Sequence, residues 1–312
     1  MQATDRTFWA VEPCDAQLGE HVPGRLAMEY GTDQSGRVSY RFNSAGFRGE
    51  DYDPDARIRI CVIGESQAFG TGLHEELIFG NRVADHLAAA LDVPREEVNL
   101  LNLSVGGASS DYVTRMVLKH VPGLEFDLVL LAYPQPQRME HFNGETYEQF
   151  DLAALAPGRQ EGLPRPLRGY RDLNNDHLGR IAMLKNVLLA QGLMEHARIP
   201  YVIATEFLRP NLQARPYLAP FLGALDDRWV LRHRCFVLGF DRAADGVHGG
   251  AMAHGALAIS MLPVIAAQFE RHGEEDAVDQ LTTYHRYLTE TDPDWHSMRR
   301  AVREARERAL RT

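Results

Sequence analysis

The chain has 312 residues, of which 45% are hydrophobic and 24% charged, so it can bury a sizeable core as an ordinary globular protein. Its formal net charge of −10 argues against nucleic acid or an anionic membrane surface as the main partner. Cys14, Cys61 and Cys235 stand far apart, which excludes a disulfide framework and a paired-cysteine zinc site. No apolar run reaches the roughly 20 residues of a membrane helix, and the first residues lack a signal-peptide core. We therefore expect a cytoplasmic protein that needs no metal or organic cofactor.

The first part of the chain alternates predicted strands with predicted helices. Residues 1–45 are rich in glycine, proline and polar groups and indicate an arm packed on the main domain. Short apolar runs predict buried strands over 58–63, 98–103 and 127–133. Apolar residues spaced three and four apart predict a helix over 75–91, and a second helix is expected over 112–120.

The pattern breaks over residues 134–176, which hold several prolines, glycines and charges and no long period. A segment of this length inside a domain is typical of a functional lid. A helix over 178–197, a strand over 201–205, one further strand within 229–238 and a helix over 252–269 follow. We assign 46–272 to one catalytic domain and 273–312 to a charged, helical C-terminal extension. The alternation predicts a three-layer α/β/α sandwich with a mostly parallel sheet of about five strands.

A serine lies where the first strand of the sheet ends, at Gly64-Glu65-Ser66. Open α/β sheets build their sites at the carboxyl ends of their strands. Such a serine becomes a nucleophile only when a base lies within hydrogen-bond reach and a third group orients that base. His248, in a glycine-rich loop near the end of the domain, is the best base, and Asp245 precedes it at a spacing that lets its carboxylate bond Nδ1. The alternative is an ordinary strand–helix turn whose serine only caps the helix.

Three blocks in the right order resemble the SGNH (GDSL-type) hydrolases, whose fold is flavodoxin-like. They are Gly64-Glu65-Ser66 followed by Phe69-Gly70, then Asn102 to Gly107, then Asp245 to His248. The segment 43–49 also resembles one that precedes the serine block in a branch of this family. The resemblance implies that Ser66 is the nucleophile, His248 the general base and Asp245 the orienting acid. It also implies an oxyanion hole formed by the backbone N–H groups of Ser66 and Gly107.

The family's third oxyanion donor, an asparagine, falls here on Pro136, which has no side-chain donor. Gln135 or Gln137 can supply the same amide group on a longer stem, unless both only face solvent. We expect Tyr133, Arg138 and His141 to belong to the substrate lid, and Arg138 and Arg168 to meet an anionic substrate unless they are ordinary surface residues. His254 is expected to cap or pack the last helix of the domain, and Cys61 to be a small core residue.

These observations favour a serine-dependent acyl-ester hydrolase that acts through an acyl-Ser66 intermediate and deacylates a sugar or another small metabolite. An acyltransferase or thioesterase-like enzyme of a biosynthetic pathway, acting on an acyl-carrier substrate, is the first alternative. A ligand-binding or assembly module with the same fold and a weak active site is the second. The sequence leaves the acyl group, its acceptor and the oligomeric state open.

Overall fold

The structure, a computed structural model, describes residues 26–33, 36–142, 147–151, 176–208, 215–233, 235–236 and 241–311. Its centre is a five-stranded sheet in the order β4-β3-β5-β8-β9, in which every neighbouring pair is parallel. The strands are β3 (Ile58–Gly64), β4 (Val98–Asn102), β5 (Leu128–Tyr133), β8 (Tyr201–Thr205) and β9 (Val230–Arg232). All five lie where the sequence predicts strands, so the predicted fold class is confirmed.

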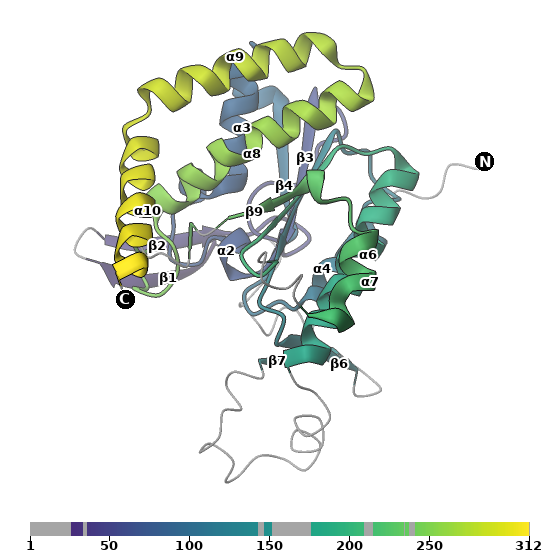
Figure 1. Ribbon diagram of the computed structural model, residues 1–312. Coiled ribbons are helices and arrows are strands. Elements are labelled where there is room, and N and C mark those ends of the chain that lie inside the picture. Colours follow the sequence, from purple (N-terminus) through teal and green to yellow (C-terminus); the bar gives the residue numbers. More distant parts are fainter. Residues whose placement is uncertain are drawn as a thin grey trace.

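Helices cover both faces of this sheet (Figure 1). One face carries α3 (Phe79–Ala90) and α8 (Ala251–His272), and the other carries α4 (Ser110–His120), α6 (Asp176–Ala197) and the short α7 (Ala219–Ala224). Strand β3 shows why both faces need a cover, since Ile60 and Val62 pack on the α3–α8 side while Cys61 and Ile63 pack on the α4–α6 side. A strand that is apolar on both faces is stable only between two layers.

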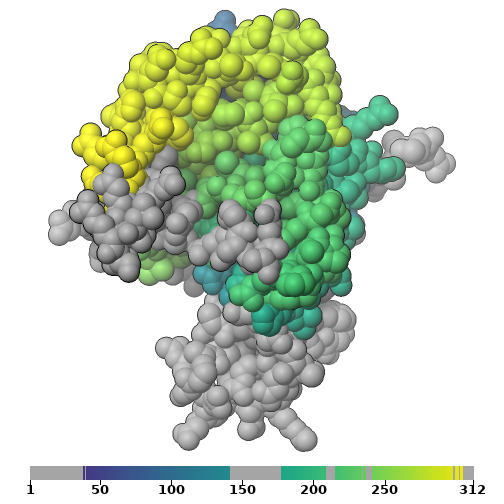
Figure 2. Space-filling view, in the orientation of Figure 1, coloured from purple at the N-terminus to yellow at the C-terminus, as the bar shows by residue number. Residues whose placement is uncertain are grey.

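Two C-terminal helices, α9 (Glu275–Thr291) and α10 (Pro293–Arg311), follow α8. Leu281 and Leu288 of α9 are buried in the same core cluster as α3 and α8, so the predicted extension adds to the outer side of that layer. In the space-filling view α9 and α10, in yellow, form one continuous surface with the rest of the chain (Figure 2). Helix α8 is long and apolar enough to cross a membrane, judged by length and composition alone, a feature that the sequence analysis did not single out. In the structure, 72% of its most apolar window is buried inside the protein.

The expectations for two other segments need correction. The predicted helix over 75–91 is divided into a 3-10 turn (Glu75–Leu77) and α3. The segment 134–176, expected to lack regular structure, begins with an antiparallel hairpin of β6 (Arg138–Phe142) and β7 (Tyr147–Asp151). Residues 152–175, including Arg168, lie outside the described residues. The hairpin was missed because its strands are only five residues long and neither keeps a strict alternation of polar and apolar side chains.

Part of the N-terminal arm is a two-stranded antiparallel sheet, β1 (Leu26–Asp33) and β2 (Gly36–Arg41). Val38, Tyr40 and Phe42 are buried and form a small cluster with Phe69, which ends the single-turn helix α2 (Ser66–Phe69). The arm therefore packs directly behind the predicted nucleophile.

Candidate active site

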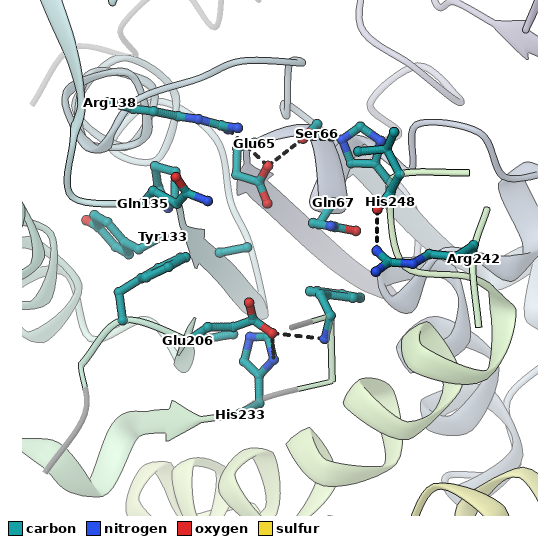
Figure 3. Close-up of a pocket in the computed structure, with 16 residues that line it drawn as sticks. Glu65, Ser66, Gln67, Tyr133, Gln135, Arg138, Glu206, His233, Arg242 and His248 are labelled. Atoms are coloured by element: carbon teal, nitrogen blue, oxygen red, sulfur yellow. Dashed lines mark hydrogen bonds and ion pairs between the residues drawn. The ribbon is translucent and has the colours of Figure 1, made fainter. Parts of the chain in front are cut away.

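A pocket of about 340 Å³ opens at the carboxyl ends of the central strands (Figure 3). Its lining comes from four places in the chain: the turn after β3, the end of β5 with the start of β6, the ends of β8 and β9, and the loop before α8. The polar members of this lining are Glu65, Ser66, Gln67, Gln135, Arg138, Glu206, His233, Arg242 and His248. A pocket at this edge is where an open parallel sheet is expected to bind ligands.

Ser66 is the first residue of α2, and the residue before it, Glu65, has an extended backbone. A Cβ atom at Gly64 would lie 2.6 Å from Cβ of Ala68 and 2.8 Å from Cβ of Ala132, distances that real side chains do not tolerate. Glycine at this position therefore lets the turn lie against β5 and brings Ser66 to the edge of the pocket. As the first residue of the helix, Ser66 has a backbone N–H without an intrahelical acceptor.

The structure brings Ser66, His248 and Asp245 together. Nε2 of His248 lies 2.8 Å from Oγ of Ser66, and Nδ1 of His248 is hydrogen-bonded to Oδ2 of Asp245. The other carboxylate oxygen of Asp245 accepts the backbone N–H groups of Val247 (2.9 Å) and His248 (3.0 Å). Partial burial by itself would raise the pKa of Asp245, but these N–H groups and the imidazole ring lower it. Asp245 is thus held as a carboxylate that fixes the ring with Nε2 towards the serine.

Two amide side chains hold α2 in place. Asn102, at the end of β4, donates from Nδ2 to the carbonyl of Ala68 (3.0 Å) and accepts the N–H of Ser104 (3.0 Å). Gln67, which sequence reasoning missed, accepts the N–H of Gly249 (3.1 Å) and so joins α2 to the loop that carries His248.

Arg48, from the segment that resembles the family's upstream block, lies beneath α2 and is 1% exposed. Its guanidinium donates to the carbonyls of Phe69 (2.9 Å), Gly70 (2.6 Å) and Leu73 (2.6 Å) and lies over the ring of Tyr40, 4.3 Å from the centroid. Burial lowers the pKa of Arg48 to about 10, which leaves the guanidinium charged at neutral pH. Through Arg48 this segment holds the end of α2, the helix that begins with Ser66, in place.

Some of the expected oxyanion donors line the pocket and others do not. Gly107 lies in the loop after β4, is exposed and has φ = 79°, but it is not among the residues that line the pocket. Gln135 lines the pocket, whereas Gln137 does not. Of the two glutamines, Gln135 is therefore the one that lies at the pocket.

The three residues expected in the lid lie in different parts of the structure. Arg138 lines the pocket and its Nη1 donates to Oε2 of Glu65 (3.3 Å). Tyr133 belongs to β5, and its buried hydroxyl donates to the carbonyl of Asn186 (3.2 Å), so it forms the wall of the pocket and not part of a lid. His141 lies in β6, in the part of the hairpin whose side chains are not described.

His254 is fully buried in α8, where Nδ1 accepts the N–H of Phe79 at the start of α3 (3.1 Å). Burial lowers its pKa to about 3, so the ring is neutral. This histidine packs and caps helices, and Cys61 is likewise a fully buried residue of β3.

Across the pocket from Ser66 lies a second acid–base pair, Glu206 and His233 (Figure 3). Oε1 of Glu206 accepts the N–H of Phe236 (2.9 Å) and lies 3.6 Å from Nδ1 of His233. Burial lowers the pKa of His233 to about 3. Sequence reasoning missed this pair, although Glu206 directly follows a buried strand, the same signal that pointed to Ser66.

No protein-family model and no curated protein sequence matches the chain. Among solved structures, TesA matches at 13% identity with a TM-score of 0.44, over 67% of this chain and 99% of TesA. The psychrotrophic esterase EstA from Pseudoalteromonas sp., solved with monoethylphosphonate, matches at 13% identity and a TM-score of 0.42, over 68% of this chain and 98% of EstA. A two-domain esterase active on acetylated mannans matches at 16% identity and a TM-score of 0.27, over 70% of this chain and 50% of that protein. Likenesses at this level carry no argument about activity or substrate.

Proposed function

We propose that the protein is a serine-dependent acyl-ester hydrolase of the SGNH type that forms an acyl intermediate on Ser66. The observation that carries this proposal is the unbroken set of contacts from Asp245 through His248 to the serine hydroxyl at the edge of a pocket. A serine, a base and a group that orients the base are the parts that nucleophilic acyl transfer requires.

In the proposed reaction Oγ of Ser66 attacks the ester carbonyl carbon while its proton passes to Nε2 of His248. The carboxylate of Asp245 stabilises the imidazolium, which then gives the proton to the oxygen of the departing alcohol as the C–O bond breaks. Water then adds to the acyl carbonyl carbon as it gives a proton to Nε2 of His248. The bond between that carbon and Oγ breaks, the imidazolium returns the proton to Oγ, and the acid leaves.

The N–H of Ser66 and the amide of Gln135, both in the pocket lining, are the donors that we assign to the developing oxyanion. The N–H of Gly107, which the family resemblance implies as a further donor, lies outside this lining. Gln135→Ala should lower kcat by about 10²- to 10³-fold if its amide donates to that oxygen. Gln137→Ala, outside the pocket lining, is the matched control and should keep the wild-type rate. Equal rates for both variants would remove Gln135 from the oxyanion hole.

We propose a small, polar acyl ester, such as an acylated sugar or metabolite, as substrate. The cavity is near the lower end of the range of about 300–1,000 Å³ for small-molecule sites. Its walls carry both carboxylates and guanidinium groups, which suits an alcohol portion with several hydroxyl groups better than a long apolar chain.

The experiment that tests the proposal is hydrolysis of p-nitrophenyl acetate and longer p-nitrophenyl esters, together with labelling by diisopropyl fluorophosphate. We expect Ser66→Ala to abolish hydrolysis and labelling and His248→Ala to reduce both sharply. A folded protein that is neither active nor labelled would instead be a binding or assembly module. Transfer of the acyl group to an added alcohol or amine, in place of free acid, would make the chain an acyltransferase.

A further inference from the structure

The hydroxyl of Ser66 touches two proton acceptors at once. One is Nε2 of His248 at 2.8 Å, and the other is Oε2 of Glu65 at 2.6 Å. Both distances are those of full hydrogen bonds. Because a serine hydroxyl has a single proton, it can donate to only one of the two.

The second contact therefore needs a second proton. Oε2 of Glu65 also accepts from the guanidinium of Arg138 (3.3 Å), an ion pair whose side chains are 13% and 20% exposed. A carboxylate is a stronger hydrogen-bond acceptor than a neutral ring nitrogen. When the serine proton points to Glu65, the contact between His248 and Oγ requires a proton on Nε2.

We propose that Glu65 is a second proton acceptor for Ser66, which competes with His248 and holds the resting site in an arrangement that cannot attack. The reactive arrangement forms when Nε2 loses its proton to solvent and the hydroxyl turns its own proton from Glu65 to Nε2. Arg138 opposes the competition, because it shares the same carboxylate oxygen and weakens that oxygen as an acceptor. The inference rests on the proposed function and adds that Glu65 controls when Ser66 can act as the nucleophile.

Arg138 is well placed for this role because the start of the hairpin is fixed to the protein. Its own N–H donates to the carbonyl of Gln135 (3.1 Å). Two positions further along β6, Glu140 pairs with Arg115 of α4 at 2.6 Å, and the N–H of Glu140 donates to Asp111 (3.0 Å). The guanidinium of Arg138 thus reaches Glu65 from a strand that is held in place by contacts with α4.

The other charged or titratable groups around Ser66 and Glu65 come from every element that lines the pocket. His233 stays neutral, since burial lowers its pKa to about 3, and it therefore adds no ionisation between pH 5 and 9. Among the residues that the structure describes, those beside Arg138 are Asp245, His248 and Arg242 from the loop before α8, Glu206 after β8, and His233 after β9.

The test compares the pH dependence of kcat/KM for p-nitrophenyl acetate in the wild type and in Glu65→Gln. The glutamine side chain of this variant has the same shape as glutamate but no charge, and its amide can donate to Oγ while the hydroxyl bonds Nε2. Because both acceptors touch the same oxygen, removal of the negative charge should lower the pH of half-maximal rate. The plateau rate should fall by less than about 100-fold, the loss expected for removal of a catalytic base.

Arg138→Met supplies the opposite perturbation. Without the guanidinium the carboxylate competes more strongly, so the pH of half-maximal rate should rise. In the double variant Glu65→Gln/Arg138→Met this rise should shrink, because the group through which Arg138 acts is gone. Glu65→Asp, which retracts the carboxylate by one methylene, should shift the profile in the same direction as Glu65→Gln.

Two results would overturn the inference. Superimposable profiles for the wild type and Glu65→Gln would show that the carboxylate takes no part in holding the proton. A plateau lowered by about 100-fold or more in Glu65→Gln would make Glu65 a catalytic base and not a competitor. Either outcome leaves the proposed function standing if activity still requires Ser66, whereas undiminished activity in Ser66→Ala removes the proposed function itself.

Discussion

Replacement of the buried arginine beneath the nucleophile is the sharpest test of how this site is held together. In Arg48→Lys the charge is kept, but a flexible ammonium replaces a flat fork that donates to three carbonyls and stacks on Tyr40. Lysine and arginine are not equivalent at a stacked, multiply bonded position. We expect the variant to fold, to be less stable and to react more slowly.

The magnitude follows from the lost contacts. An ammonium at this depth reaches one or two of the three carbonyls, and each lost hydrogen bond to a charged donor costs about 1.5–3 kcal/mol. The cation–π contact with Tyr40 contributes about 0.5–2 kcal/mol more. The sum is about 2–8 kcal/mol, and its middle value of about 5 kcal/mol lies at the lower end of the roughly 5–15 kcal/mol by which most domains are stable, so a folded population should remain for the assay.

The assay is urea unfolding together with the rate of labelling by diisopropyl fluorophosphate under conditions where the variant is folded. The labelling rate should fall by about 10-fold or more, since a displacement of about 1 Å can cost that much. Arg41→Lys is the control, because Arg41 lies on the neighbouring strand β2, is 54% exposed and makes only surface ion pairs. If Arg48→Lys matched Arg41→Lys in both stability and labelling, the bracing role assigned to Arg48 would be wrong.

Three further predictions concern the rest of the pocket and the core. Asp245→Asn should lower kcat roughly 10³- to 10⁴-fold, since it leaves the imidazole in the wrong tautomer, and unchanged turnover would contradict its role. Glu206→Gln should lower kcat/KM for an acetylated sugar but not for p-nitrophenyl acetate; equal effects on both would exclude recognition of the alcohol portion. Because burial lowers the pKa of His254 to about 3, unfolding binds a proton below pH about 6.5, so stability should fall by about 2 kcal/mol per such histidine between pH 7 and pH 5. Urea midpoints at the two pH values measure this, and His254→Gln should remove its share.

The sheet and the residues of the proposed triad were predictable because their signals are local. An apolar run of five residues ending at Gly64 gives a buried strand, and the serine follows it within two positions. Asp245 and His248 are three residues apart, and the bonds between them form within one turn. The long sequence separation between Ser66 and His248 was bridged by the rule that all carboxyl ends of a parallel sheet meet at one edge.

What the sequence missed depends on contacts between distant segments. Tyr133 was predicted to belong to a lid because it directly precedes the segment 134–176. Its hydroxyl instead donates to the carbonyl of Asn186 in the α4–α6 layer. Arg48 looked like part of a family segment, and nothing in its neighbours indicates that it would be 1% exposed. The contact of Arg138 with Glu65 likewise joins residues 73 positions apart, across a hairpin that was not predicted.

Gly72 joins the N-terminal arm to the loop that carries Asp245, which explains why the arm belongs to the site. Its N–H donates to the hydroxyl of Tyr40 (2.7 Å) in the arm, and its carbonyl accepts the N–H of Ala244 (2.9 Å), next to Asp245. With φ = +77° and a position where a Cβ would lie 3.1 Å from the backbone N of Asp245, only glycine fits without strain. The segment after the nucleophile is thus fixed on one side by the arm and on the other by the loop of the acid. The distance from Ser66 to His248 therefore also depends on Gly72, Tyr40 and Ala244, which lie outside the pocket lining.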